Sequence, residues 1–252
     1  MRKVYVIGIG AGDPDYVTVQ AVRALNAADV VFVLEKAEET QDLVDLRRTI
    51  LERHVEGTPR VVTAQDPPRA RGTADYGGAV RDWRRRRADV CEALIRDELA
   101  PGRSGAFLAW GDPAFYDSTL GVLDDILDRG FVEFSVEVVP GISAPQALAA
   151  RHRVVLNRVG GAIQVTTGRR LAAGVPAEAD DVVVMLDAEQ AFAALPGDEW
   201  DIYWGAYLGT PDEVLIAGRL DEVAEEIATV RARTREAKGW MFDTYLLRRR
   251  RP

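Results

Sequence analysis

The chain has 252 residues, of which 47% are hydrophobic and 29% charged, and this balance is typical of a folded globular protein with a substantial core. Its formal net charge of −8 offers no overall attraction for nucleic acid or for an anionic membrane surface. A single cysteine, Cys91, excludes an internal disulfide, and two histidines leave too few ligands for a Cys/His metal site. No apolar run has the length of a membrane span or the pattern of a signal peptide. We therefore expect a cytoplasmic protein with no metal and with no nucleic-acid or membrane partner.

The first apolar run, Val4–Ile9, predicts a buried strand that leads into a glycine-rich loop at residues 8–14, Gly-Ile-Gly-Ala-Gly-Asp-Pro. The loop does not fit the dinucleotide-binding pattern, because Asp13 or Asp15 stands where that pattern needs its last glycine. It does not fit the Walker pattern either, because no Gly-Lys-Ser/Thr follows. An acid repels a phosphate, so the loop suits a cationic or neutral ligand with donor groups. The alternative is a tight turn that needs glycine only for its backbone angles.

Strand and helix patterns alternate through the first half of the chain, which predicts a mostly parallel sheet with helices between its strands. Thr18 is placed to cap the first of these helices. A long loop at residues 65–78 is of the kind that often covers a binding site. The strands predicted after the first are Val30–Leu34, Arg60–Thr63, Gly105–Trp110 and Val132–Val139, and the helices cover residues 18–28, 43–51, 79–99 and 120–127.

Four consecutive arginines, Arg84–Arg87, fall on the third predicted helix. Consecutive helical positions point in different directions, so these side chains cannot form one patch. We expect a solvated face, with one or two of the four within reach of carboxylates at the edge of a cleft.

Two later turns repeat the arrangement of strand, glycine and polar residue. Gly-Asp-Pro at 111–113 follows the fourth predicted strand, and Val-Pro-Gly-Ile-Ser at 139–143 ends the fifth. Ser143 and Gln146 fit a capping box that opens a helix. Ligands of parallel sheets bind outside the carboxyl ends of the strands, and all three loops leave strands at that edge. The sequence therefore predicts one site formed by three loops.

Beyond Gln146 the pattern changes to short apolar runs with fewer helices between them, which predicts a mixed sheet with antiparallel neighbours. We place the boundary between two α/β lobes so that residues 1–139 form the first and residues 140–252 the second. The strands predicted for the second lobe cover residues 163–166, 182–186, 202–208, 214–218 and 240–247, and its later helices cover residues 188–195 and 221–238.

The three loops together resemble those of the tetrapyrrole methylases, a family of S-adenosyl-L-methionine-dependent methyltransferases. The match consists of the glycine loop at 8–14, Gly-Asp-Pro at 111–113 and Val-Pro-Gly-Ile-Ser at 139–143, in the order and spacing of the family. Ala11 stands where the family usually has proline, a departure that affects the rigidity of the loop more than its chemistry. The resemblance implies two α/β lobes with the cofactor S-adenosyl-L-methionine in the cleft between them, and it implies a homodimer.

Further motifs resemble one branch of this family, which methylates precorrin-5 at ring carbon 1 and releases the acetyl group as acetate, giving precorrin-6A in cobalamin biosynthesis. They include Trp-Gly-Asp-Pro-Ala-Phe-Tyr-Asp-Ser-Thr at 110–119, Thr-Thr-Gly-Arg-Arg-Leu at 166–171 and Trp-Met-Phe-Asp at 240–243. Three alternatives stay open: another corrin-ring methyltransferase, a non-catalytic protein that binds the cofactor or a tetrapyrrole, and a protein-modifying methylase of the same fold.

The resemblance also implies roles for individual residues. Arginines suit the many carboxylates of a precorrin, because a guanidinium pairs with a carboxylate in two places at once. For any single arginine, an ordinary surface ion pair is the better explanation. The residues expected around the cofactor are Gly10, Ala11, Trp110, Gly111, Asp112, Phe115, Ser143, Ala144, Met185, Ala206 and Tyr207. The arginines expected near the substrate are Arg151, Arg153, Arg169 and Arg170.

Methyl transfer to a ring carbon is a direct displacement, which requires alignment of two bound molecules but neither a covalent nucleophile nor a metal. Orientation alone is worth roughly 7–11 kcal/mol of barrier in favourable cases. Deacetylation differs, because water must attack an acyl carbon, and a general base or an oxyanion donor assists that step. The candidates for these roles are Asp13, Asp112, Tyr116 and His152, which the sequence does not rank.

Overall fold

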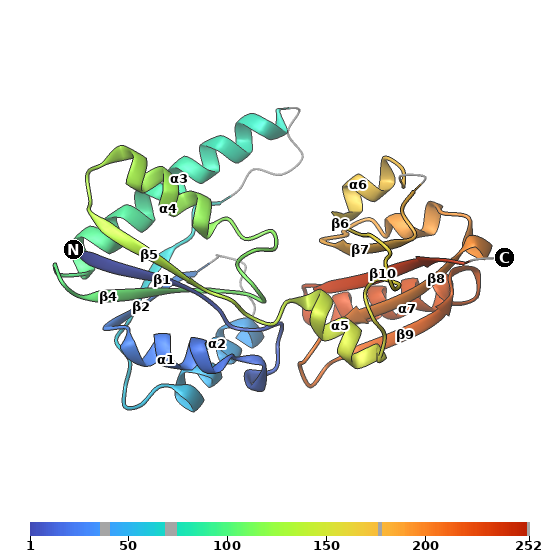
Figure 1. Cartoon of the computed structure of the whole chain (residues 1–252), viewed down its shortest axis with the longest axis horizontal. Coiled ribbons are helices and arrows are strands. Elements are labelled where there is room, and N and C mark those ends of the chain that lie inside the picture. The colour runs from blue at the N-terminus through green and yellow to red at the C-terminus, as the bar shows by residue number, and fades with distance from the viewer. Residues whose placement is uncertain (36–40, 69–74, 176–177, 251–252) are drawn as a thin grey trace. The chain divides into compact units, whose positions relative to one another are not determined.

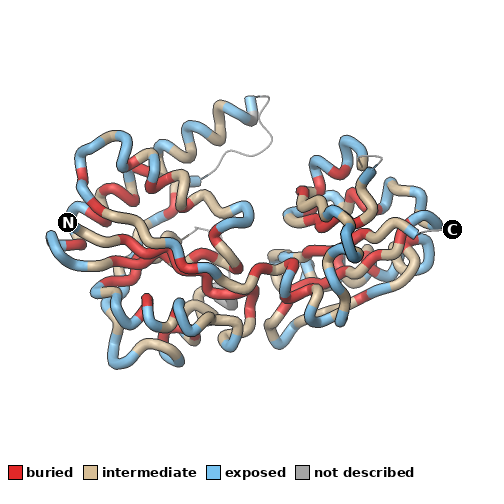
Figure 2. Tube along the Cα trace, viewed as in Figure 1, coloured by how far each residue is buried: buried red, intermediate tan, exposed pale blue. Residues whose placement is uncertain are grey.

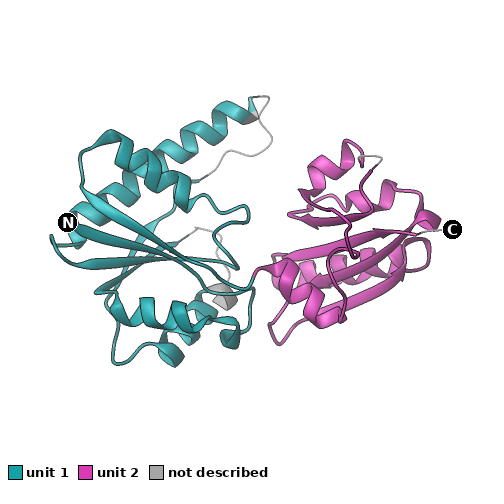
Figure 3. Ribbon diagram, viewed as in Figure 1, with its two compact units in different colours: residues 1–142 teal, residues 143–252 magenta. Residues whose placement is uncertain are grey.

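The computed structural model describes residues 1–35, 41–68, 75–175 and 178–250 (Figure 1). The chain divides into two compact units, Met1–Ile142 and Ser143–Pro252 (Figure 3). The boundary expected from sequence, between Val139 and Pro140, therefore falls just inside the first unit.

The first unit is built on a five-stranded sheet with the strand order β3-β2-β4-β1-β5. Every pair of neighbouring strands is parallel, which confirms the predicted parallel sheet. Because the strands run in the same direction, they end together at one carboxyl edge. Helices cover both faces of the sheet (Figure 1). The strands are β1 (Arg2–Gly8), β2 (Val30–Glu35), β3 (Val61–Gln65), β4 (Ser104–Ala109) and β5 (Phe134–Val139), and the helices are α1 (Val19–Ala27), α2 (Gln41–His54), α3 (Tyr76–Glu98) and α4 (Thr119–Arg129).

The interior strand β1, which lies between β4 and β5, is buried along most of its length (Figure 2). Its side chains alternate between two hydrophobic clusters. Val4 and Val6 belong to the cluster that includes residues of α3 and α4. Tyr5 and Ile7 belong to the cluster that includes residues of α1 and α2. Because successive strand side chains point to opposite faces, an unbroken apolar run is what a strand covered on both faces requires. This interior position, between β4 and β5, fixes the point at which β1 leads the chain into its glycine loop.

The second unit is built on a mixed sheet with the order β6-β7-β10-β8-β9. Only β6 and β7 pair in parallel, and the other neighbours are antiparallel, as the close spacing of apolar runs predicted. Two tryptophans, Trp200 and Trp204, are fully buried in its core. The helices are α5 (Ala144–His152), α6 (Gly168–Ala172) and α7 (Leu220–Lys238), and the strands are β6 (Ile163–Thr167), β7 (Asp181–Met185), β8 (Trp200–Ala206), β9 (Val214–Arg219) and β10 (Asp243–Arg249).

The prediction of a helix over residues 188–195 is wrong, because a short 3₁₀ turn, η2 (Ala191–Ala194), forms there instead. The carboxylate of Asp187 accepts the N–H groups of Glu189 and Ala191, which folds the chain into a turn before a helix can start. Gln190 has φ +57°, a left-handed value that no α-helix contains.

The loop predicted at residues 65–78 is shorter than expected, because α3 begins at Tyr76. Asp75 caps this helix by accepting the N–H of Gly78 at 2.7 Å. Residues 69–74, the middle of the loop that was expected to cover a site, lie outside the described residues.

No helix in the described parts of the chain combines the length and the apolar character of a membrane span. Over the same residues, acidic, histidine and cysteine side chains do not gather in groups of three or more that could bind a metal ion.

Candidate functional site

The first two glycine loops lie against each other at the carboxyl edge of the parallel sheet. Gly10 and Gly111 exchange backbone hydrogen bonds, with N···O distances of 3.2 Å from Gly10 to Gly111 and 2.8 Å in the reverse direction. The neighbouring Ile9 N–H donates to the carbonyl of Ala109, the last residue of β4, at 3.0 Å. Since β1 and β4 are adjacent strands, the sheet itself brings these loops together.

The third loop packs against the first two so closely that it requires glycine. A Cβ atom added to Gly141 would lie 2.1 Å from the carbonyl oxygen of Gly111, and one added to Gly8 would lie 2.6 Å from the Gly141 nitrogen. These neighbours are backbone atoms, which cannot turn aside as a flexible side chain can. The Thr18 hydroxyl, which caps α1 as predicted, also reaches the carbonyl of Pro140 at 3.4 Å.

Asp112 joins the second loop to the third. Its Oδ2 accepts the N–H of Gly141 at 2.8 Å, and its Oδ1 accepts the N–H of Ala114 at 2.7 Å. Asp13 has a similar local role, because its Oδ1 accepts the N–H of Asp15 at 2.9 Å and caps a short 3₁₀ turn, η1 (Pro14–Tyr16). Both aspartates offered by the sequence as acid–base candidates are thus engaged in shaping their loops.

Ser143 opens α5 with the capping box that the sequence predicted. Its hydroxyl and its backbone N–H both donate to Gln146 Oε1, at 2.9 and 2.8 Å, and the residue is only 1% exposed. The side chain of Ser143 is therefore committed to the start of the helix.

His152 lies at the end of α5 and is partly buried. Its Nε2 is 3.0 Å from the carbonyl oxygen of Trp204, and its ring meets that of Tyr203 edge to face. A carbonyl only accepts, so this contact places the hydrogen of the neutral ring on Nε2. Burial lowers the pKa of His152, which favours the neutral ring. These contacts are those of a packed histidine rather than of a free general base.

Tyr116 differs from the other three acid–base candidates. It is 48% exposed, and its backbone has φ +54°, a left-handed value that is uncommon outside glycine. The preceding residue, Phe115, is also exposed. Partial burial raises the pKa of the Tyr116 hydroxyl.

In the second unit, two of the expected cofactor residues end strands that lie on either side of β10, at one edge of the mixed sheet. Met185 and Ala206 are the last residues of β7 and β8, and both pair with the start of β10, which lies between them. The next residues, Leu186 and Tyr207, both have positive φ, +55° and +50°. Backbone strain at residues other than glycine is typical of functional sites.

The side chain of Tyr207 faces the interior of the second unit. Only 2% of the residue is exposed, its hydroxyl donates to the carbonyl of Trp240 at 2.7 Å, and burial raises its pKa. Any contact of Tyr207 with a ligand would therefore use its backbone.

A buried polar network that the sequence reasoning missed lies beneath this edge. Asp187 accepts the hydroxyl of Tyr245 at 2.6 Å, and its carbonyl accepts from Arg231 at 2.6 Å. Arg231 also pairs with Asp243 at 2.9 Å, and the side chains of both are about 95% buried. Burial raises the pKa of Asp243, and the Arg231 charge opposes that rise. Asp243 belongs to the motif at 240–243, but no motif marks Asp187, Arg231 or Tyr245. The network is recognisable only once the fold has buried these residues together.

The four arginines expected near the substrate have different surroundings. Arg151 pairs with Glu213 at 2.6 Å, so its charge is shared. Arg153 ends α5 in a left-handed conformation and is exposed. Arg169 and Arg170 are exposed on α6, directly after β6, whose last residue pairs with Met185. These two arginines are thus at the same edge of the second sheet as the expected cofactor residues.

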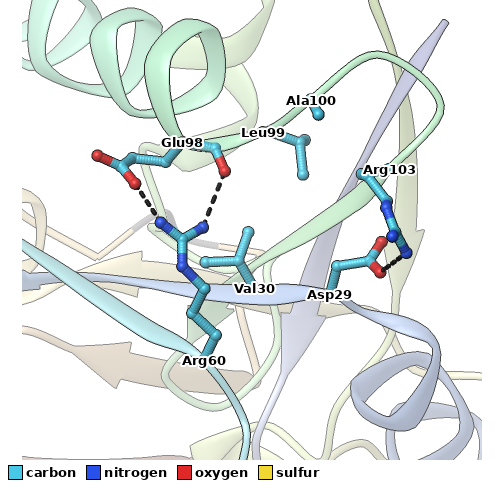
Figure 4. A pocket seen from close by; sticks show the side chains of 7 residues that line it. All are labelled: Asp29, Val30, Arg60, Glu98, Leu99, Ala100 and Arg103. Carbon is cyan, nitrogen blue, oxygen red and sulfur yellow. Dashed lines mark hydrogen bonds and ion pairs between the residues drawn. The ribbon is translucent and has the colours of Figure 1, made fainter.

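A hollow of about 330 Å³ lies at the opposite, amino-terminal end of strands β2 and β4 (Figure 4). Its charged side chains are paired, Arg60 with Glu98 and Arg103 with Asp29, the latter at 2.8 Å (Figure 4). It does not involve any of the residues expected at the site.

Residues 3–224 match the family model of the tetrapyrrole (corrin/porphyrin) methylases. The chain belongs to this family. The two α/β units with one parallel and one mixed sheet agree with the fold that the loop motifs implied.

Individual members of the family resemble this tetrapyrrole methylase over its whole length. Precorrin-6A synthase (deacetylating) from Sinorhizobium sp. is 46% identical over 250 residues, which cover 99% of this chain and 96% of the relative. The crystal structure of a cobalamin synthesis related protein (CobF) from Corynebacterium diphtheriae is 37% identical and superimposes with a TM-score of 0.85, covering 98% of each chain.

A second similar structure is a uroporphyrin-III C-methyltransferase from Thermus thermophilus in complex with S-adenosylhomocysteine. It covers 97% of this tetrapyrrole methylase and 96% of its own chain, with a TM-score of 0.54. At 20% identity, this likeness shows the fold alone.

Proposed function

We propose that this protein is an S-adenosylmethionine-dependent methyltransferase that methylates precorrin-5 at ring carbon 1 and releases the acetyl group as acetate, giving precorrin-6A. The observation that carries the proposal is the 46% identity, along nearly the full length of both chains, to the deacetylating precorrin-6A synthase of Sinorhizobium sp.. The likeness to the Corynebacterium diphtheriae structure supports the same branch of the family. We further propose that the protein acts in the cytoplasm as a homodimer, as the family resemblance implies.

The chemistry of the loops suits the proposed cofactor. S-adenosylmethionine carries a positive sulfonium and an amino group, and carboxylates attract both. Asp13 and Asp112 place two carboxylates within the glycine loops of the first unit, where they would repel a phosphate. The close approach of Gly8, Gly111 and Gly141 leaves backbone rather than side chains at the carboxyl edge.

The family resemblance implies cofactor residues at strand ends of each unit, and we propose the same residues for this protein. Loops after β1 and β4 contribute from the first unit. The start of α5 and the ends of β7 and β8 contribute from the second unit. The residues proposed to surround the cofactor are Gly10, Ala11, Trp110, Gly111, Asp112 and Phe115 from the first unit, and Ser143, Ala144, Met185, Ala206 and Tyr207 from the second.

When bound, the cofactor would supply a methyl group on a sulfonium sulfur. The loops would then hold the methyl group in line with ring carbon 1 of the substrate and exclude water from between them. Rigid loops serve this purpose, and the hydrogen bonds of Asp112 and of the Gly10–Gly111 pair restrict their movement. Alignment of this kind is worth roughly 7–11 kcal/mol of barrier in favourable cases.

We propose Arg169 and Arg170 as the main receptors for substrate carboxylates, with Arg153 as a further candidate. Their exposure on the described surface and the position of α6 after β6 support this assignment. Arg151, whose guanidinium pairs with Glu213 at 2.6 Å, stays a further candidate.

Incubation of the protein with precorrin-5 and methyl-labelled S-adenosylmethionine tests the proposed function. We expect labelled precorrin-6A and one equivalent of acetate. Methyl transfer without acetate would instead indicate another corrin-ring methyltransferase. Binding of S-adenosylhomocysteine in calorimetry, without turnover of any precorrin, would indicate a non-catalytic carrier.

A further inference from the structure

Removal of the acetyl group is assisted by a hydrogen-bond donor at the acetyl carbonyl oxygen. Water adds to the acetyl carbonyl carbon, and the carbonyl oxygen takes up negative charge. The bond from that carbon to ring carbon 1 then breaks, and its electron pair stays on the ring, where it forms the new bond to the methyl group. One water is consumed, acetate leaves and two protons reach the solvent. A hydrogen-bond donor aimed at the developing oxyanion accelerates such a step.

Three of the four acid–base candidates already have partners. Asp13 and Asp112 accept backbone N–H groups, and His152 bonds a backbone carbonyl. Tyr116 is the exception within the described part of the chain, where its hydroxyl makes no hydrogen bond and burial is the sole influence on its pKa. That influence raises the pKa, so the hydroxyl keeps its proton and remains a donor at neutral pH.

The loop that carries Tyr116 is fixed before the tyrosine. Asp112 accepts the N–H of Ala114 through its side chain at 2.7 Å and that of Phe115 through its carbonyl at 3.2 Å. Asp112, which also bonds to the third glycine loop, therefore fixes the backbone that leads directly to Tyr116.

The same loop is fixed after the tyrosine by an unusual helix start. Ser118 occupies the N-cap position of α4, yet its hydroxyl caps nothing and instead accepts a hydrogen bond from Arg87. Asp117 takes over the cap by accepting the N–H of Thr119 at 2.6 Å.

Arg87 anchors this helix start to the edge of the sheet. Its Nε is 3.2 Å from Asp66 Oδ1, and the two side chains are 15% and 3% exposed. Asp66 directly follows β3, and its N–H donates to the carbonyl of Glu35 at the end of β2. The anchor therefore lies at the carboxyl ends of β2 and β3, on the edge of the sheet where the glycine loops also lie. These contacts on both sides of Tyr116 explain how an exposed tyrosine keeps a backbone φ of +54°.

We propose that the Tyr116 hydroxyl is a catalytic group of the deacetylation, donating a hydrogen bond to the acetyl oxygen of the substrate as water adds. The inference rests on the proposed function. In this assignment Arg87 is a positioning residue, because it acts through Ser118 and does not contact the substrate.

The change Tyr116→Phe removes the hydroxyl and keeps the ring. We expect kcat for acetate release from precorrin-5 to fall by about 10²–10³, which is the usual loss for one oxyanion donor. The KM for precorrin-5 and the Kd for S-adenosylhomocysteine should stay within about threefold of wild type. Methylation of a precorrin-5 analogue that lacks the acetyl group should proceed at the wild-type rate, since no oxyanion forms.

A matched control is Tyr203→Phe, the same change at a tyrosine of β8 that packs against His152; this variant should release acetate at the wild-type rate. Acetate release by Tyr116→Phe within threefold of wild type would overturn the inference. So would a loss of S-adenosylhomocysteine affinity that accounts for the whole effect, because the tyrosine would then only shape the loop. If wild type itself releases no acetate, the proposed function fails rather than the role of Tyr116.

Discussion

Asp112 illustrates how a residue picked out by a motif can serve the fold and the site together. One of its oxygens is bonded to the N–H of Gly141 and the other to the N–H of Ala114. The carboxylate thus keeps two loops in register and leaves a negative charge beside them. A ligand with a positive charge would benefit from both effects.

We predict that Asp112→Ala weakens binding of S-adenosylhomocysteine while the protein still folds. The change removes the carboxylate charge beside the loops and the two hydrogen bonds that hold the loops in the binding conformation. We therefore expect Kd to rise by about tenfold, which corresponds to about 1.4 kcal/mol. Calorimetry measures the change, and circular dichroism checks the fold. Asp112→Asn keeps one acceptor oxygen and should lose less affinity. Unchanged binding in the alanine variant would show that the turn has a structural role only.

The titration of His152 makes the free energy of unfolding of the protein depend on pH. Burial lowers its pKa in the folded state below the ordinary value of 6.5. As pH falls below 6.5, the unfolded chain therefore takes up a proton that the folded chain resists, and the free energy of unfolding decreases. Above that pH the residue adds no such penalty.

We predict that His152→Gln loses less stability than wild type when the pH falls from 7.5 to 5.5. Glutamine does not titrate, and the difference between the two proteins is at most that of one proton, about 1.4 kcal/mol per pH unit. Urea unfolding at both pH values measures it. Equal losses in the two proteins would mean that His152 titrates as it does in an unfolded chain.

At the scale of elements, the contact between the first and third loops is set by the absence of side chains. The strands β1 and β5 are neighbours, so the loops that leave them meet at once. Gly8 and Gly141 face each other with backbone atoms in contact. Close packing of this kind leaves no room for even one methyl group.

We predict that Gly141→Ala lowers the free energy of unfolding by roughly 1–3 kcal/mol, the usual cost of overpacking, and also weakens S-adenosylhomocysteine binding. The matched control is Gly77→Ala near the start of α3, where a Cβ atom would lie 3.3 Å from the flexible Arg81 guanidinium and 3.8 Å from the Asp75 carboxylate. That change should stabilise the helix by about 0.5–1 kcal/mol. Denaturant unfolding compares the two variants, and a neutral Gly141→Ala would contradict the tight loop contact.

At the scale of the whole molecule, each unit has a hydrophobic core of its own. The first is divided between the two faces of the parallel sheet, and the second surrounds Trp200 and Trp204. The proposed cofactor residues occur on both units. A cofactor that binds only the folded protein would stabilise it by mass action.

We predict that S-adenosylhomocysteine at about 100 times its Kd raises the free energy of unfolding by about 2.7 kcal/mol. The same ligand concentration should stabilise Asp112→Ala less, by about 1.4 kcal/mol if its Kd is tenfold higher. Denaturant midpoints with and without ligand measure both effects. An absence of stabilisation in wild type would argue against the proposed cofactor.

The sequence by itself determined the fold class, the parallel and mixed sheets, and the helix starts at Thr18 and Ser143. These features depend on local patterns: the spacing of apolar residues, a capping side chain, and glycine after a strand. The family resemblance rested on the same local loops. Each of these signals lies within a few neighbouring residues, so it can be interpreted before the chain is folded.

Only the tertiary structure decided what the polar side chains bond to. The partner of Asp112 is 29 residues away in the sequence, and the Tyr245 hydroxyl that bonds Asp187 is 58 residues away. The same Asp187 carboxylate also accepts the N–H groups of Glu189 and Ala191, which form a turn where a helix was predicted over residues 188–195. A carboxylate has the same appearance in the sequence whether it braces a loop, caps a turn or binds a ligand. Its role is fixed by which donors the fold brings within 3 Å of it.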